Sequence, residues 1–131
     1  MELTLEQIGL PARSPQALAD WYVRTLGGSR VDLESNLPPL FVRLPGGVML
    51  EIYAATGDFP QVRDNGLAGF RHLALQVASI EQAKAELEQR GVVFTDPVKP
   101  AAGGGQVLFF ADLEGNLLHL VERTAGSVFA R

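Results

Sequence analysis

The chain of 131 residues carries 11 Lys and Arg against 15 Asp and Glu, a formal net charge of −4, and it contains no cysteine. The acidic balance argues against nucleic acid as a partner, because phosphate binding needs clustered Lys and Arg. The absence of cysteine excludes disulfides and thiolate metal sites, and no apolar run approaches the roughly 20 residues that span a bilayer. We therefore expect one compact, cytoplasmic domain with no membrane contact, in which His, carboxylate and amide groups are the possible metal ligands.

The first half of the chain predicts a strand, a helix and three more strands. Leu3 to Leu10 alternates as a strand, with Gln7 on one face and Ile8 on the other. Ser14 and Pro15 begin a helical pattern that stops at Gly27. The three strands that follow, with Pro45-Gly46-Gly47 as a hairpin turn before the last, are expected at roughly Arg30 to Leu33, Leu40 to Leu44 and Val48 to Tyr53.

Glu51 lies in the middle of an otherwise apolar strand, on the same face as Met49 and Tyr53. Burying an unpaired charge is unfavourable. Glu51 is therefore expected at a solvated edge, in an ion pair with a base such as Arg43, or bound to a metal.

The second half of the chain predicts the same order of elements. Phe70 to Val77 alternates as a strand that puts His72 on the face opposite Leu73 and Leu75. Ser79 and Gln82 form a capping-box pattern for a helix that stops at Gly91. The remaining strands, with Ala101 to Gly105 as a hairpin tip or flexible lid, are expected at Val92 to Thr95, Gln106 to Ala111 and Leu117 to Glu122.

The two halves are copies of one unit. Gln7 aligns with His72 at an offset of 72 − 7 = 65 residues, and both aligned segments end in a Ser that precedes a helix. His119 follows His72 by 47 residues and Glu51 follows Gln7 by 44, so His119 is the repeat-mate of Glu51. The sequence predicts two units, about 3–57 and 68–123, joined by a linker, 58–67. The helix–sheet cores are expected to contain Leu18, Trp21, Leu26, Leu73, Leu75, Leu87, Leu118 and Leu120.

The pattern, with the closing run Asp112-Leu-Glu-Gly-Asn-Leu-Leu-His119-Leu, resembles the vicinal oxygen chelate superfamily, which includes glyoxalases, extradiol dioxygenases and bleomycin-resistance proteins. The resemblance implies an α+β fold in which two tandem β-α-β-β-β units form an open, cup-shaped mixed sheet within a single domain, 1–131. It also implies a homodimer, a small-molecule substrate and one divalent metal ion, with Gln7, Glu51, His72 and His119 as ligands. Glyoxalases often have a glutamate where this chain has His119, and the usual glutathione-binding residues are not evident, so glutathione is not the expected substrate.

Two imidazoles, one carboxylate and one amide oxygen suit Zn, Ni, Co, Fe or Mn. The leading interpretation is a metal-dependent, glyoxalase-like lyase or isomerase acting on a small hydroxycarbonyl substrate, with Glu51 as the base. The second is a non-haem iron dioxygenase, because Glu51, His72 and His119 supply two histidines and one carboxylate. The third is a metal-free protein that sequesters an aromatic or cationic drug, as in bleomycin resistance. The side chains expected to line the substrate site are Phe41, Arg43, Tyr53, Phe70 and Phe109.

Overall fold

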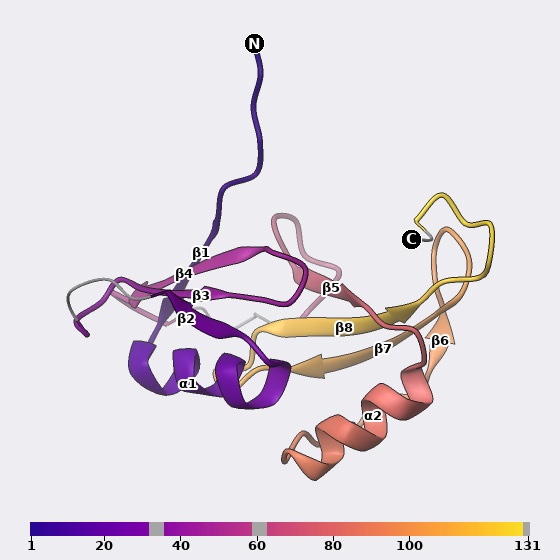
Figure 1. Cartoon of the computed structure of the whole chain (residues 1–131). Helices are drawn as coiled ribbons and strands as arrows, with labels where there is room; N and C mark the ends of the chain where they lie inside the picture. Colours follow the sequence, from indigo (N-terminus) through magenta and orange to yellow (C-terminus); the bar gives the residue numbers. More distant parts are fainter. Residues whose placement is uncertain (32–35, 59–62, 130–131) are drawn as a thin grey trace. The chain divides into compact units, whose positions relative to one another are not determined.

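The computed structural model describes residues 1–31, 36–58 and 63–129. The chain divides into two compact units, Met1–Pro60 and Gln61–Arg131. In the described residues each unit contains one helix and one four-stranded sheet, which can be followed in Figure 1. The two β-α-β-β-β units that the sequence predicts are confirmed, whereas their union in a single domain stays a prediction.

The first unit is a mixed sheet with one helix packed on it. Its strand order is β1-β4-β3-β2; β1 is parallel to β4, and the other neighbours are antiparallel. The connection between the parallel strands β1 and β4 runs through the helix and the other two strands of the unit, since a parallel pair requires a crossover. The elements are β1 (Ile8–Ala12), α1 (Pro15–Leu26), β2 (Ser29–Val31), β3 (Leu40–Arg43) and β4 (Met49–Ala54).

Local chemistry sets the bounds of α1. Pro15 occupies the start of the helix, where its missing N–H has no helical partner to lose. Gly27 ends the helix in the left-handed conformation at φ 73, which glycine adopts without steric strain. The buried stripe of α1 packs on the sheet, and the core of this unit contains Leu18, Ala19, Tyr22, Leu40, Val42, Leu50 and Ile52.

The second unit repeats this architecture. Its strand order is β5-β8-β7-β6, with β5 parallel to β8 and the other pairs antiparallel. The elements are β5 (His72–Gln76), α2 (Ile80–Gln89), β6 (Lys99–Pro100), β7 (Gln106–Ala111) and β8 (Leu117–Glu122). Neither helix in the described part of the chain has the length and apolar character needed to cross a membrane.

Two side chains anchor the start of α2. The Ser79 hydroxyl accepts a hydrogen bond from the Gln82 N–H at 3.2 Å, which confirms the predicted cap. The Glu122 carboxylate accepts a hydrogen bond from the Ile80 N–H at 2.8 Å and adds a negative charge where the helix dipole favours one. The apolar face of α2 then packs over a core that contains Ile80, Leu87, Leu108, Phe110, Leu118 and Leu120.

The register of the two sheets matches residue by residue. Gly9 pairs with Glu51 in the first unit, and Ala74 pairs with His119 in the second. On the other side of the same strands, Phe41 pairs with Glu51 and Phe109 pairs with His119. Glu51 and His119 therefore occupy equivalent positions, each between a small residue and a phenylalanine.

The hairpins that precede β4 and β8 also match. Leu44 N–H donates to Val48 C=O at 2.8 Å in the first, and Asp112 N–H donates to Asn116 C=O at 3.0 Å in the second. In the second hairpin the Asp112 side chain also accepts hydrogen bonds from the N–H groups of Glu114 and Asn116. The run before His119 is thus a hairpin held by its own aspartate.

Two strand predictions need correction, and a third is tested only in part. Val92 to Thr95 forms no strand, because the Val92 N–H bonds to Leu87 C=O and Phe94 packs against Phe110, so the alternation reflects a segment folded back from α2. The short β6 replaces it. The strand expected from Leu3 starts only at Ile8, whose partner Leu50 lies at the start of β4. The strand expected at Arg30 to Leu33 is β2, which extends to Val31, and its last two predicted positions lie outside the described residues.

Four of the eight residues predicted for the core are buried. Leu18, Leu87, Leu118 and Leu120 are buried. The other four are only half-buried, namely Trp21, Leu26, Leu73 and Leu75. Tyr22, beside Trp21 on α1, takes the fully buried position instead.

Candidate functional site

Two imidazoles lie together on the face of the second sheet opposite α2. His72 comes from β5 and His119 from the adjacent parallel strand β8. Because His72 pairs with Leu117 and Ala74 pairs with His119, the histidines are two residues apart in register and project from the same face. Their ring centroids are 4.5 Å apart.

Phe109 of β7 extends this group. Its ring centroid lies 4.8 Å from that of His119 and 5.8 Å from that of His72. The Lys99 ammonium of β6 lies 5.5 Å from the Phe109 centroid, within the range of a cation–π contact. Each of the four strands therefore supplies one member of this group, which we call the His–Phe–Lys cluster: His72, Lys99, Phe109 and His119.

His119 is buried, with 8% of its surface exposed. Neither of its ring nitrogens has a hydrogen-bond partner among the described residues. Burial, then the charges of His72 and Arg123, lower the pKa of His119 from 6.5 to about 4. The ring is thus neutral near pH 7 and has a lone pair available for a metal ion or a hydrogen-bond donor.

His72 is exposed, and its ring contacts Asn65 of the segment that precedes β5. Its Nδ1 lies 2.7 Å from the amide oxygen of Asn65. An imidazole that donates from Nδ1 carries its lone pair on Nε2, the form in which a histidine binds a metal. Asn65 therefore orients His72 from the connecting segment, for which the sequence predicts no structural role.

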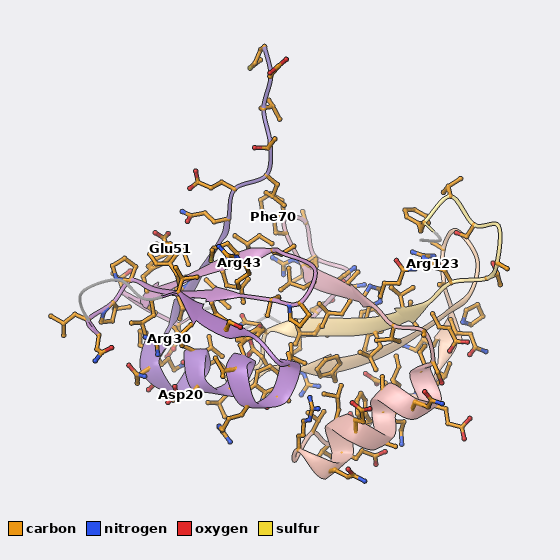
Figure 2. The ribbon with its side chains drawn as sticks, viewed as in Figure 1. Asp20, Arg30, Arg43, Glu51, Phe70 and Arg123 are labelled. Atoms are coloured by element: carbon orange, nitrogen blue, oxygen red, sulfur yellow. The ribbon has the colours of Figure 1, made fainter. Side chains whose placement is uncertain are left out.

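The first unit holds the other two predicted ligands. Glu51 is half-buried on β4 and forms no ion pair with any described residue, so the expected pairing with Arg43 is not formed. Figure 2 shows Glu51 and Arg43 on the sheet face away from α1, with Arg30 and Asp20 on the helix side. Gln7, also half-buried, precedes β1, and alternation assigns it to the face of Glu51.

The expected lining residues differ in position. Phe41 is half-buried opposite Glu51, and the Tyr53 ring lies over Gly9, where a Cβ would be 3.4 Å from Tyr53 Cε1. Arg43 is exposed. Phe70 precedes β5 and its side chain is fully exposed (Figure 2).

Each unit thus supplies two of the four expected metal ligands. Across residues 1–31, 36–58 and 63–129, no three His, Cys, Asp or Glu side chains form a group that could hold a metal ion. Within the second unit the imidazoles form a pair. The binding of all four side chains to one ion stays a prediction.

Three residues near the histidines were not anticipated from the sequence. Asn65 lies in a segment without periodicity, and Lys99 lies in a two-residue strand that ends in proline. Arg123 follows β8, where alternation could have assigned it to the face of His119.

A model of the Glyoxalase/Bleomycin resistance protein/Dioxygenase superfamily matches residues 4–120. The chain belongs to this superfamily. No curated protein matches the sequence. The match ends one residue after His119 and therefore covers both histidines, Gln7 and Glu51.

Solved structures of the superfamily share the fold. A member from Sphaerobacter thermophilus is 25% identical, with a TM-score of 0.68 over 93% of this chain and 98% of its own. The fosfomycin resistance protein FosX from Listeria monocytogenes, crystallised with Mn(II) and dihydroxypropylphosphonic acid, is 21% identical, with a TM-score of 0.71 over 95% of this chain and 94% of its own. TioX from Micromonospora is 19% identical, with a TM-score of 0.65 over 92% and 99%. The glyoxalase-like α+β fold is thereby confirmed.

Proposed function

We propose that this chain is a divalent-metal-dependent lyase or isomerase of the glyoxalase type that acts on a small, metal-chelating hydroxycarbonyl substrate without glutathione. The observation that carries the proposal is the state of His119. Its two ring nitrogens are buried without a partner among the described residues, next to a second imidazole. Buried polar groups without partners are rare and call for an explanation, and a bound metal ion would supply one.

The proposed ligands of one ion are Gln7, Glu51, His72 and His119. A neutral His119 and a His72 held at Nδ1 each leave a nitrogen free to bind a metal. These donors suit Zn, Ni, Co, Fe or Mn, and the bound ion would polarise a substrate carbonyl. Glu51, which has no ion-pair partner among the described residues, would remove the proton next to that carbonyl.

Superfamily membership supports the proposal, and one structural neighbour, FosX, was crystallised with Mn(II). Likeness at this identity carries only the fold, so the support for a metal site in this chain comes from its own residues. We also propose a homodimer as the working assembly, for which sedimentation velocity is the test.

Metal binding should be tested on protein without a His tag, because a tag binds divalent metal itself. The chain has only two histidines, so each can be substituted in turn. Untagged protein should contain close to one equivalent of a divalent metal by mass spectrometry, or take it up from Mn, Ni or Zn salts after chelator treatment. His72→Ala and His119→Ala should each abolish stoichiometric binding. Gln76→Ala, on the same face of β5, is the matched control and should bind as wild type does.

The same experiment separates the alternatives. Stoichiometric metal together with oxygen uptake after anaerobic iron loading would favour the dioxygenase. A wild-type protein that binds no metal and keeps its thermal stability in chelator would contradict the proposal and favour a metal-free binding protein.

A further inference from the structure

The face of the second sheet that carries the His–Phe–Lys cluster is cationic. Glu122, which follows on β8, turns to the other face and bonds to the Ile80 N–H at 2.8 Å. None of the described strand residues on the cluster's face is acidic: they are His72, Ala74, Gln76, Lys99, Val107, Phe109, Ala111, Leu117, His119 and Val121. A positive charge at this face therefore has no strand carboxylate beside it.

Lys99 carries a positive charge on this face that no described carboxylate neutralises. Its ammonium lies 5.5 Å from the Phe109 centroid and forms no ion pair with any residue in the described ranges. Lys84 on α2 makes the same kind of contact, 5.7 Å from the Phe94 centroid, but it is paired with Glu88 at 2.7 Å. The two lysines share one aromatic geometry and differ in whether an anion accompanies it.

The other nearby cation, Arg123, is already engaged. Its Nη1 donates to the carbonyls of Ala102 at 2.6 Å and Gly104 at 3.0 Å, and its guanidinium lies 4.2 Å from the Phe129 centroid. Arg123 thus adds positive potential near His119, while its donors hold the loop between β6 and β7. The three N–H donors of the Lys99 ammonium can therefore bind a ligand.

We propose that Lys99 binds an oxyanion of the substrate, so that the substrate is a small molecule with a carboxylate or phosphate-type group next to its hydroxycarbonyl. The Phe109 ring lies 5.5 Å from the Lys99 ammonium, whose donors that point away from the ring can bind the anion. An anion bound there lies against the aromatic ring that also contacts His119, which places the rest of the molecule at the histidines. This inference rests on the proposed function for its placement of the reacting group, but anion binding itself needs no metal.

The test is titration of chelator-treated, ¹⁵N-labelled protein with inorganic phosphate and, separately, with lactate, a carboxylate that carries a neighbouring hydroxyl. Amide shifts at Lys99, Phe109 and His119 should saturate with at least one of them. Lys99→Met should weaken that binding about tenfold, the loss expected for one hydrogen bond to a charged group, and Lys99→Arg should retain most of it. Preference for phosphate or for lactate distinguishes the two oxyanion classes.

Lys84→Met is the matched control, since it removes a lysine that also lies over a phenylalanine, and it should leave both titrations unchanged. Equal weakening by the two methionine variants would overturn the proposal, as would wild-type protein whose shifts at Lys99 and Phe109 do not saturate with either anion. Repeating the titrations with Zn(II), which is diamagnetic and preserves the amide signals, separates the two proposals. Metal uptake without anion binding contradicts only the role of Lys99, and anion binding without metal uptake contradicts only the metalloenzyme.

Discussion

The amide oxygen of Asn65 lies 2.7 Å from Nδ1 of His72. Asn65 belongs to the segment between the two repeats, seven residues before the histidine. An amide oxygen accepts, so the Nδ1 of a neutral His72 carries the proton and Nε2 carries the lone pair. This contact selects the tautomer in which His72 can act as a metal ligand.

Asn65→Ala should remove the preference of His72 for the tautomer with its proton on Nδ1. In the chelator-treated variant, the ¹⁵N shifts of the His72 ring should move from a predominantly Nδ1–H tautomer toward the mixture seen in free histidine. Metal affinity should fall about 10- to 100-fold, the usual effect of losing a partner that orients a ligand. Ring ¹⁵N spectra and a metal titration measure the two effects independently.

Asn65→Asp is the rescue variant because it keeps an acceptor oxygen facing Nδ1. It should restore the Nδ1–H tautomer and most of the metal affinity. An alanine variant with unchanged ring shifts would show that Asn65 has no part in setting the tautomer.

The repeat could be predicted from the sequence because its two copies share the same order and spacing of residues. The similar spacings from Gln7 to Glu51 and from His72 to His119 placed Glu51 and His119 at equivalent positions, and the pairing of Gly9 with Glu51 and of Ala74 with His119 confirms that equivalence. Ser79 marked the start of α2 by its capping chemistry. The cap depends on residues a few positions apart and the repeat on similar spacings along the chain, and one sequence contains both.

The contacts that complete the candidate site depend on residues far apart or on weak local patterns. Lys99 reaches Phe109 through a two-residue strand, too short to give a periodic signal. Alternation at Val92 to Thr95 led to a strand being predicted there instead. Val92 is in fact buried and bonded to the end of α2. The Asn65 contact is set by the path of a connecting segment, which side-chain periodicity does not describe.

His119 should make the metal-free protein less stable in acid. Because the pKa of His119 is lowered from 6.5 to about 4, the unfolded chain binds the proton more readily than the folded chain does. Stability should therefore be fully present above pH 6.5 and decline as the pH falls toward 4, by at most about 3 kcal/mol from this group. Urea unfolding at pH 7.5 and pH 4.5, in chelator, measures the decline.

His119→Leu removes the titrating group and should show a smaller loss of stability between the two pH values than wild type. His72→Gln keeps the buried ring and the largest cause of the shift, which is burial, so it should retain most of the wild-type decline. Identical declines in wild type and His119→Leu would mean that carboxylates alone govern the acid response.

Gly105→Ala should be strongly destabilising for a steric reason. Gly105 has φ +99, and a Cβ there would overlap the carbonyl oxygen of Glu122. Gly46 has a similar φ of +93 but nothing within 4 Å of its Cβ position, so Gly46→Ala measures the backbone strain alone. We expect about 1 kcal/mol for Gly46→Ala and at least about 3 kcal/mol for Gly105→Ala by urea unfolding. Equal losses would show that the strand end relaxes freely around the added methyl group.

The sharpest test of the proposed chemistry is Glu51→Gln. The substitution keeps the shape and one oxygen donor of the side chain but removes the charge of the proposed ligand and the basicity of the proposed base. With Zn(II) present, wild type should catalyse exchange of the α-protons of dihydroxyacetone with D₂O, a reaction that proton NMR follows directly. Exchange by the variant should be slower by at least about a hundredfold, the contribution expected of a positioned base.

Glu6→Gln serves as the control, since Glu6 is exposed outside the sheet and should leave the exchange rate unchanged. Metal content must be measured for every variant, because Glu51 has two proposed roles. A Glu51→Gln protein that binds metal but exchanges slowly assigns the base to Glu51. A variant that binds metal and exchanges at the wild-type rate assigns the base elsewhere. Equal exchange by wild type with and without chelator would remove the metal from the reaction, since a carboxylate alone would then account for the proton transfer.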